Sequence, residues 1–369
     1  MKVKTITCHE VYNHGASLQE YALLKFLENH GHETETIHYK PDYLSNHFNF
    51  WRISNPRYEK NIVFKVVYLI AKFPFRYKML KRKKSFDTFS KKHIKSTKKL
   101  YKTNEDIKLD LPEADAYICG SDQIWNSFFK NGKDPAFYLD FAPENSLKIS
   151  YAASFAIDKL ENNIKQFVKE KISRLNHISV RESSGKDIIK DLGISNDVNH
   201  VLDPVFLLKQ NDWTKLCGNS IINEDYIFVY DFDSNPLIEK FVNKQVKLHG
   251  YKIVTVNPNI KYADSNFYLD GPDVFLTLIS NAKFVVSNSF HAVAFSVVFN
   301  KQFVVFNRSE KINTRMQDFV NLFDINRVLI QNNSDIESYS SKIDYELLNK
   351  KLDVLIKTSE TFLVNSLAN

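Results

Sequence analysis

Short apolar runs alternate with segments of helical periodicity along most of the chain. This alternation is typical of α/β proteins, in which helices connect the parallel strands of a buried sheet. In the first half of the chain the pattern predicts helices at 17–29 and 162–175, and strands at 3–8, 34–39, 116–119, 148–153, 177–181 and 198–202. A basic stretch between the second and third of these strands interrupts the alternation.

A second alternating set begins after Asp203-Pro204, where proline disfavours helix at the preceding residue and so predicts a turn or linker. Its expected strands are 226–230, 252–256, 284–287 and 303–306, its expected helices are 237–249, 274–281 and one from about 292, and a charged helical tail starts near Tyr345. Two consecutive doubly wound sets predict two Rossmann-like lobes, 1–204 and 205–369, with a cleft between them.

The composition is that of a globular protein, with 369 residues of which 43% are hydrophobic and 25% are charged. Only nine residues are glycine, which argues against glycine-rich phosphate loops as the main binding device. Cys8, Cys119 and Cys217 form no CxxC pair, so we expect neither a disulfide framework nor a cysteine zinc site. No signal-peptide pattern and no long apolar window occur, and these features predict a cytoplasmic protein.

The net charge of +7 is distributed unevenly. Residues 57–102 hold 16 Lys and Arg against Glu59 and Asp87, so this segment carries +14 and the rest of the chain −7. We expect a basic helical insertion in the first lobe at about 46–102. One interpretation is peripheral contact with the anionic inner face of the membrane. The alternative is a solvated insertion whose lysines cover apolar neighbours. No nucleic-acid fold signature is present, so we expect no nucleic-acid partner.

Candidate chemistry is sought just after the strands, because ligands of doubly wound sheets bind beyond the carboxyl ends of the strands. Asn13, Gly15 and Gln19 belong to the segment 13–19, which joins the first strand to the first helix. Gly15 permits close approach of the backbone, and free amides at the start of a helix can receive an anion. An ordinary strand–helix turn would give the same local sequence.

The segment 119–126 also follows a strand and contains Ser121, Asp122 and Asn126. So many donors and acceptors at a strand end suit a polyol ligand or a proton transfer. A capped turn, with Ser121 or Asp122 as the capping residue, explains the same pattern equally well.

Two candidate cations follow strands in different lobes. Arg181 ends the strand 177–181, and a guanidinium there can bind a carboxylate or phosphate, although a structural ion pair is the alternative. Ser289 and His291 follow the strand 284–287 near the start of the next helix, where the helix dipole favours an anion. A lone histidine is more often structural, but this one lies where a ligand is expected. An anionic ligand held between the lobes would face both cations.

Six motifs occur together in the order found in one family, and the chain resembles the polysaccharide pyruvyl transferases over about residues 3–325. The motifs are NHGASLQEYAL (13–23), GSDQIWN (120–126), SYAASF (150–155), ISVRE (178–182), LDP (202–204) and SFH (289–291). The resemblance implies a two-lobed fold similar to GT-B glycosyltransferases. It also implies transfer of pyruvate from phosphoenolpyruvate to two hydroxyls of a sugar in a surface or capsular glycan precursor, as a ketal.

The resemblance maps the family's donor-binding arginine and histidine onto Arg181 and His291, and we hypothesise the other roles from the chemistry of the candidate residues. His291 is expected as the acid or phosphate stabiliser and Asp122 as the base or the group that orients a hydroxyl. The donor would be held by Arg181, Ser289, His291 and Arg315, and the acceptor by Asn13, Gly15, Gln19, Ser121, Asp122 and Asn126. Phosphoenolpyruvate is a substrate, so no cofactor is implied. We expect no metal, because His30 and His32 lie near no acidic or cysteine group with ligand spacing.

Two alternatives from other functional classes remain at this point. A GT-B-type glycosyltransferase using a nucleotide sugar would share the two-lobed architecture. A non-catalytic glycan-binding relative is favoured only by Asn288 and Ala292, where the chain departs from the family pattern. The sequence identifies neither the acceptor sugar nor whether the acceptor is lipid-linked.

Overall fold

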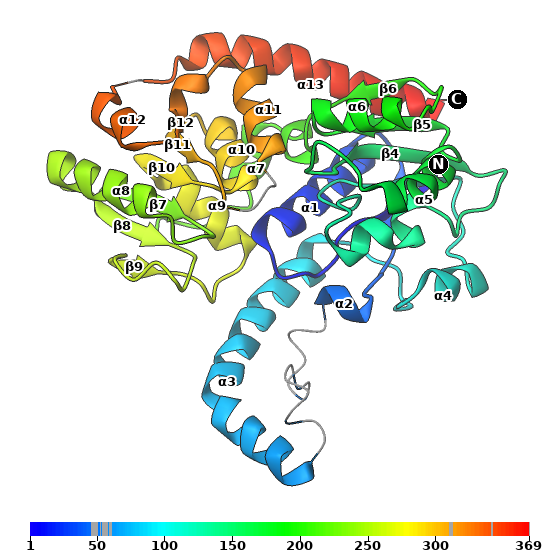
Figure 1. The fold of residues 1–369 in the computed structure, drawn as a ribbon, viewed down its shortest axis with the longest axis horizontal. Coiled ribbons are helices and arrows are strands. Elements are labelled where there is room, and N and C mark those ends of the chain that lie inside the picture. Colours follow the sequence, from blue (N-terminus) through cyan, green and yellow to red (C-terminus); the bar gives the residue numbers. More distant parts are fainter. Residues whose placement is uncertain are drawn as a thin grey trace.

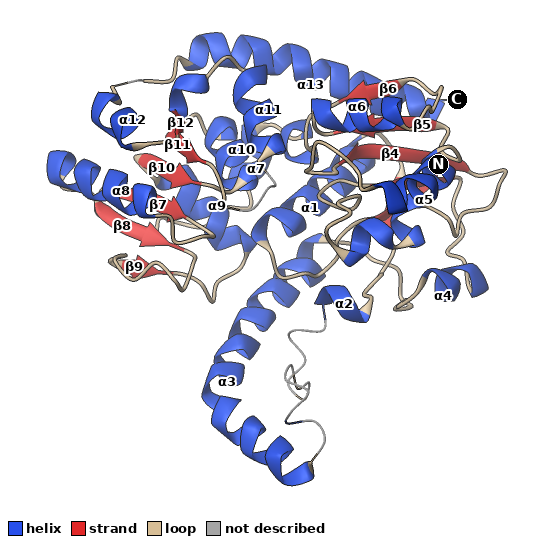
Figure 2. Ribbon diagram, in the orientation of Figure 1, coloured by secondary structure: helices blue, strands red, loops and turns tan. Residues whose placement is uncertain are grey.

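The computed structural model describes residues 1–45, 51, 53, 58, 61–309, 313–340 and 342–368. Its strands form two separate parallel sheets with helices packed around them (Figure 2). The fold therefore confirms the predicted α/β architecture with two Rossmann-like lobes. None of the described helices is long and apolar enough to cross a membrane.

The first sheet has the strand order β2-β1-β3-β4-β5-β6, and all its pairings are parallel. Its strands are β1 (Lys2–Ile6), β2 (Glu33–Thr36), β3 (Ala116–Cys119), β4 (Leu147–Ala153), β5 (His177–Val180) and β6 (Val198–His200). The helices of this part of the chain are α1 (His14–Asn29), α2 (Asp42–Ser45), α3 (Ile62–His93), α4 (Asn104–Leu109), α5 (Asn162–Ile172) and α6 (Ser183–Asp191).

The second sheet has the order β12-β11-β10-β7-β8-β9 and is also parallel. Its strands are β7 (Tyr226–Tyr230), β8 (Lys252–Thr255), β9 (Ser265–Asn266), β10 (Phe284–Ser287), β11 (Gln302–Phe306) and β12 (Leu329–Ile330). The accompanying helices are α7 (Gln210–Thr214), α8 (Pro236–His249), α9 (Pro272–Asn281), α10 (Phe290–Val298), α11 (Thr314–Leu322), α12 (Asn333–Ser338) and α13 (Tyr345–Ala368).

The central strands are apolar because helices cover both faces of each sheet. Every residue of β3 and of β7 is buried. The expected strand 34–39 is shorter in the structure, since β2 ends at Thr36 and the chain continues through isolated bridges to Ser96 and Tyr101. Helix α1 begins three residues earlier than expected, because Asn13 caps it by accepting a hydrogen bond from the amide of Ala16.

Helix α3 projects away from the two lobes (Figure 1). Its second half returns to the body, where Arg82, Phe86 and Phe89 are buried. Its first half exposes large apolar side chains, including Ile62, Phe64, Val67, Ile70 and Phe75. The basic insertion predicted at about 46–102 therefore contains a long helix, while residues 46–50, 52, 54–57 and 59–60 lie outside the described part.

Helix α13 confirms the helical tail expected from about Tyr345, and it runs along one side of both lobes (Figure 1). The Ser359 hydroxyl accepts a hydrogen bond from the amide of Leu202, and the ring of Phe362 lies 6.4 Å from that of Tyr151. The end of the chain thus packs on the first sheet. The division of the chain at residues 204 and 205 stays a prediction.

Candidate active site

A small pocket of about 190 Å³ opens between the two lobes, at the carboxyl ends of the central strands. Its lining comes from the first lobe through Asn13, Asp122 and Gln123, and from the second through Phe232, Asn288, Ser289, Phe290, His291, Arg308, Asn313, Arg315 and Met316. Five predicted site residues therefore line one pocket: Asn13, Asp122, Ser289, His291 and Arg315. This volume lies below the range of about 300–1,000 Å³ typical of pockets for drug-sized ligands.

Asp122 is held at the pocket by an unusual turn after β3. Gly120 has a φ of +122°, and a Cβ at this position would lie 2.1 Å from the carbonyl oxygen of Tyr151, so only glycine fits. Asp122 itself has a φ of 66°, in the left-handed region that aspartate tolerates better than most residues. Such turns are enriched at functional sites.

Asp122 lies between two guanidinium groups. Its Oδ1 is 3.6 Å from Nη2 of Arg181 and 3.7 Å from Nη1 of Arg315. Asp203 forms a second bridge, because its Oδ2 accepts a hydrogen bond from Nη1 of Arg181 and lies 3.6 Å from Nε2 of His291. One network thus joins Arg181 of the first lobe to His291 and Arg315 of the second.

The charges of this network are buried, and their surroundings shift the pKa values of several groups. Burial and the nearby Arg181 lower the pKa of Arg315 to about 10, and Asp122 compensates only in part. For Asp203 burial acts to raise the pKa, but Arg181 and His291 outweigh it and hold the pKa of this carboxyl well below its usual range. Asp203 is therefore ionised, whereas the Arg315 cation lacks full compensation, so an incoming anion would stabilise it.

Arg181 lies deeper than the sequence suggests. Only 1% of its side chain is exposed, and it does not line the pocket. Its guanidinium carbon lies 4.8 Å from the centre of the Phe290 ring, and that of Arg315 lies 5.9 Å from the same centre. Arg181 and His291 do meet at one site, as expected, but Asp203 stands between them.

His291 lies in the first turn of α10, directly against α1. A Cβ at Gly15 would lie 2.1 Å from Nδ1 of His291, so glycine in the first turn of α1 makes room for the imidazole. The Nε2 atom of His291 is buried and has no hydrogen-bond partner among the described residues. Ser289 is the N-cap position of α10, and its side chain makes no capping bond. The imidazole, the hydroxyl and the helix start are therefore available to a ligand.

The remaining predicted residues, Gln19, Ser121 and Asn126, do not line the pocket but form hydrogen bonds next to it. Ser121 donates to the carbonyl of Ala152, and its amide donates to Oε1 of Gln19. Gln19 in turn donates to the Thr7 hydroxyl. Asn126 is fully buried and does not line the pocket, but its side-chain amide donates a hydrogen bond to Oε1 of the lining residue Gln123. Gln19, Ser121 and Asn126 thus hold the loops that carry Asp122 and Gln123.

Several residues in or beside the pocket are not predicted from the sequence. Asp203 was read only as the start of a turn, although it lies in the LDP motif. Arg308 lines the pocket and pairs with Asp233 at 3.5 Å, and Asn288 fixes the neighbouring loop by accepting from the amide of Phe232. Arg308 follows the strand β11, so the rule of inspecting strand ends could have found it.

A larger hollow of about 810 Å³ lies between the first sheet and α13 and is lined by residues such as His177, Asn199 and Phe362. None of the predicted site residues lines it. It holds no concentration of charged groups like that of the small pocket. The small pocket is therefore the better candidate for the active site.

Two separate parallel sheets, each surrounded by helices, give the two-lobed, GT-B-like fold. Similar solved structures include UDP-GlcNAc 2-epimerase from Neisseria meningitidis, with 13% identity, full coverage of both chains and a TM-score of 0.53. The UDP-N-acetylglucosamine 2-epimerase from Rickettsia bellii is similar, with 10% identity, 100% of this chain and 96% of that chain covered, and a TM-score of 0.53. At these identities the likeness concerns the fold alone.

The sequence model of the polysaccharide pyruvyl transferase family matches residues 13–310. The chain belongs to this family. The match extends from the residue that caps α1 to the loop after β11, and so includes the segments that line the first-lobe side of the pocket and most of the second-lobe side. A sequence comparison with curated proteins gives no match.

Proposed function

We propose that the protein transfers the pyruvate group of phosphoenolpyruvate to two hydroxyls of a sugar in a surface or capsular glycan precursor. The observation that carries this proposal is the small pocket between the lobes, where Arg315, Arg308 and His291 gather at the start of α10. Phosphoenolpyruvate is small and carries both a carboxylate and a phosphate. Buried guanidinium groups bind such anions through paired, charge-assisted hydrogen bonds.

The donor would take over part of the role of Asp122. Before binding, Asp203 pairs closely with Arg181, whereas Asp122 compensates the charge of Arg315 only in part. The two distances from Asp122 to the guanidinium groups, 3.6 and 3.7 Å, exceed hydrogen-bond length. Nε of Arg315 and Nη2 of Arg181 have no hydrogen-bond partner among the described residues. A phosphate or carboxylate oxygen would supply the missing acceptor to Arg315 and release Asp122 toward the sugar.

In this reaction the methylene carbon of the donor gains a proton and becomes a methyl group. The adjacent carbon forms bonds to two sugar oxygens, and its bond to the phosphate oxygen breaks. Of the two hydroxyl protons, one ends on the new methyl group and the other on the released phosphate. His291, in the first turn of α10, would deliver the proton or stabilise the leaving phosphate. Asp122 would accept the proton of an attacking hydroxyl. Ser289 and Asn13 lie at the same pocket and would orient the reactants.

Release of inorganic phosphate from phosphoenolpyruvate tests the proposal. The purified protein is incubated with phosphoenolpyruvate and a panel of glycosides that each present a pair of free hydroxyls. We expect acceptor-dependent phosphate release and a product with the mass of acceptor plus pyruvate less water. Sugar transfer from UDP-GlcNAc, with no phosphate from phosphoenolpyruvate, would instead favour the glycosyltransferase alternative.

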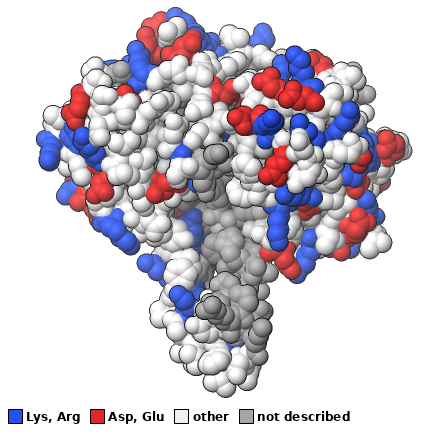
Figure 3. Space-filling view, viewed as in Figure 1, with Lys and Arg blue, Asp and Glu red and all other residues white. Residues whose placement is uncertain are grey.

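We also propose that residues 62–84 of α3 bind the surface of an anionic membrane. Residues 62–84 contain no acidic residue and seven Lys and Arg besides the buried Arg82, and the same stretch exposes Ile62, Phe64 and Ile70 at 72%, 55% and 68%. Figure 3 shows Lys and Arg side chains on this projecting part. Interfacial segments combine apolar side chains that enter the lipid boundary with cations that meet the headgroups. Such contact would bring the pocket to a lipid-linked acceptor.

Co-sedimentation with vesicles tests this contact. Replacing the exposed Lys72, Lys78 and Lys84 by glutamine is expected to lower binding to anionic vesicles roughly a hundredfold, at about 1 kcal/mol per cation. A control variant removes the same charge from the body at Lys130, Lys159 and Lys186, which are also exposed. Equal loss in both variants, or binding that ignores lipid charge, would contradict a specific role of α3.

A further inference from the structure

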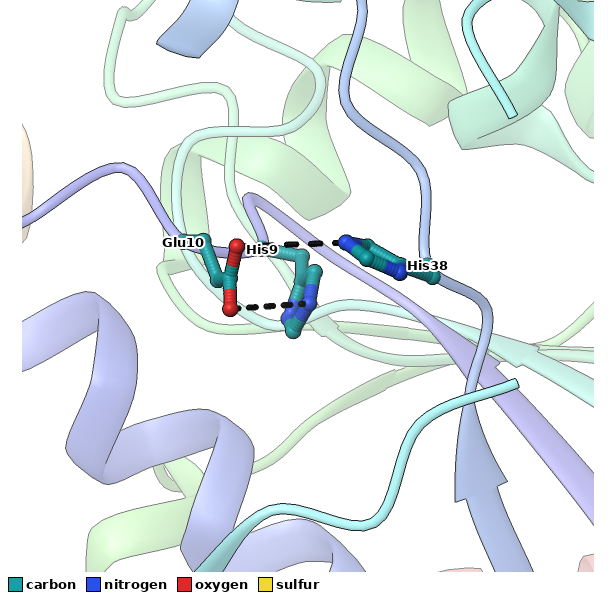
Figure 4. Close-up of side chains that lie close together, drawn as sticks. All are labelled: His9, Glu10 and His38. Carbon is teal, nitrogen blue, oxygen red and sulfur yellow. Dashed lines mark ion pairs between the residues drawn. The ribbon is translucent and has the colours of Figure 1, made fainter. Parts of the chain in front are cut away.

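A second cluster of polar side chains lies at the edge of the first sheet, outside the pocket. His9 and Glu10 follow β1, and His38 follows β2 (Figure 4). One nitrogen of each imidazole and one oxygen of the carboxylate all lie within 4.8 Å of one another. Parallel strands bring these residues together because their carboxyl ends share one edge of the sheet. His38 is distant from His9 and Glu10 in the sequence, so the sequence alone does not reveal this cluster.

His9 is oriented by a buried carboxylate. Its Nδ1 lies 2.7 Å from Oε1 of Glu20, and the side chains of His9 and Glu20 are 2% and 1% exposed. In this arrangement Nδ1 carries the proton that Glu20 accepts, and the lone pair remains on Nε2. Histidines that bind metals are commonly held in this way by a carboxylate on the other ring nitrogen.

The free nitrogens of both histidines face Glu10. Nε2 of His9 lies 4.0 Å from Oε1 of Glu10, and Nε2 of His38 lies 3.8 Å from Oε2. Both Nε2 atoms are buried and have no hydrogen-bond partner among the described residues. A buried polar atom without a partner is unfavourable unless a ligand satisfies it. Here two such atoms point toward one carboxylate.

We propose that His9, Glu10 and His38 bind a divalent first-row transition-metal ion of the Zn²⁺ class. Two imidazoles and one carboxylate are a ligand set that zinc uses when one position is left for water or another ligand. With metal–ligand bonds of about 2.0–2.2 Å, tetrahedral ligand atoms lie about 3.4 Å apart. The three ligand atoms here lie within 4.8 Å of one another, so the side chains must close by at most about 1.4 Å to bind the ion. The imidazoles and the carboxylate reach the ion from two loops.

Lys40 limits the affinity of this site. Its ammonium donates a hydrogen bond to Oε2 of Glu10, which leaves Oε1 as the oxygen that faces His9. The side chains of Lys40, Glu10 and His38 are 19%, 17% and 24% exposed, so an ion can enter from solvent. The ammonium repels a bound cation, and its removal should therefore strengthen metal binding.

The bound ion would also stabilise the hydrogen-bonded residues that hold the active-site loops in place. Glu20 is the neighbour of Gln19, which bonds to Thr7 and to the amide of Ser121. A metal on His9 would thus fix the loop after β1 against the start of the turn that carries Asp122. This positioning role is separate from pyruvyl transfer, and metal binding can be measured without substrate.

Calorimetric titration of the chelator-treated full chain with Zn²⁺ tests the site, and Co²⁺ gives a visible absorption spectrum that reports the ligand geometry. We expect one ion per chain. His38→Gln should weaken binding more than tenfold, and Lys40→Met should strengthen it. His249→Gln, a surface histidine of α8, should leave it unchanged, as a control for adventitious metal binding.

Two results would overturn the inference. One is the absence of stoichiometric binding, which would mean that His9 is an ordinary ion-pair partner of Glu20 and Glu10. The other is equal affinity in wild type, His38→Gln and Lys40→Met, which would place the ion elsewhere. His38 is half-buried and its loss should leave the fold intact, and circular dichroism of each variant checks this. Neither outcome depends on pyruvyl transfer.

Discussion

The pocket between the lobes and residues 62–84 of α3 both concentrate Lys and Arg, but they do so in opposite ways. In the pocket, Arg315 is 9% exposed and faces Asp122 and Phe290. On α3, Lys72 and Lys78 are exposed, and the described residues 62–84 include no acid. The same charge therefore acts on different targets. A buried guanidinium selects one small anion, whereas solvated lysines act on an extended anionic surface.

The dielectric environment explains this difference. Charges in water interact weakly and are screened within about 8–10 Å at physiological salt. Buried charges interact several times more strongly, and each depends on its few neighbours. We therefore expect single substitutions to have large effects in the pocket and only additive effects on α3.

Loss of the imidazole of His291 should have the largest effect. A positioned acid–base group typically contributes about 10²–10⁴-fold to the rate, so His291→Ala should lower kcat for phosphate release by that factor. The measurement is steady-state phosphate release at saturating phosphoenolpyruvate. Near-normal turnover by a correctly folded His291→Ala protein would remove this residue from the mechanism.

Gly15→Ala tests the contact between the lobes without touching a charged group. The added methyl group would lie 2.1 Å from Nδ1 of His291 and so must displace the imidazole. A misplacement of about 1 Å can reduce the rate about 10²-fold. The matched control is Gly218→Ala, whose added methyl group would lie 3.9 Å from its nearest neighbour atom, Oγ1 of Thr277.

We expect turnover to fall in Gly15→Ala and to stay normal in the control, at similar thermal stability. Equal activity of both variants would show that the position of the imidazole is unimportant. Loss of stability in Gly15→Ala alone would be detected by the same melting curves, and kcat is then compared at a temperature where both proteins are folded.

His200 and Asp318 link the lobes through a pH-dependent pair, and its effect should be the smallest. Nε2 of His200 lies 3.2 Å from Oδ2 of Asp318 on α11. Burial acts to lower the pKa of His200, but the bond to Asp318 outweighs it and raises this pKa above its ordinary value. The pair therefore stabilises the fold fully below about pH 6.5 and is lost as the pH rises through the raised pKa.

His200→Gln should accordingly lower the free energy of unfolding by about 1 kcal/mol at pH 6 and by less at pH 9. Denaturant melts of both proteins at the two pH values give this difference. A larger loss at pH 9 than at pH 6 would contradict the assigned sign.

The sequence predicts the sheets well because their strands are buried runs with a strong local pattern. The strands Ala116–Cys119, Tyr226–Tyr230 and Phe284–Ser287 have the predicted bounds at both ends. Short or polar elements such as β9 (Ser265–Asn266) lack that pattern and were missed. Burial on both faces is thus the property that makes a strand recognisable.

The site is less predictable, because its contacts join residues that are distant in the sequence. Strand ends pointed to Asp122, Ser289 and His291, and the structure brings all three to one pocket. The placement of Asp203 between Arg181 and His291 depends on how the lobes meet, and no local pattern encodes it. For the same reason, the close approach of Gly15 to His291 appears only in three dimensions.

One titration tests the central claim that a buried cation cluster between the lobes binds phosphoenolpyruvate. Calorimetry compares wild type, Arg315→Gln and the variant with Lys72, Lys78 and Lys84 replaced by glutamine. We predict that the α3 variant binds phosphoenolpyruvate like wild type, while Arg315→Gln binds about 10- to 100-fold more weakly, the loss expected for hydrogen bonds to a charged group. Unchanged affinity in Arg315→Gln, or weakened binding in the α3 variant alone, would contradict the account.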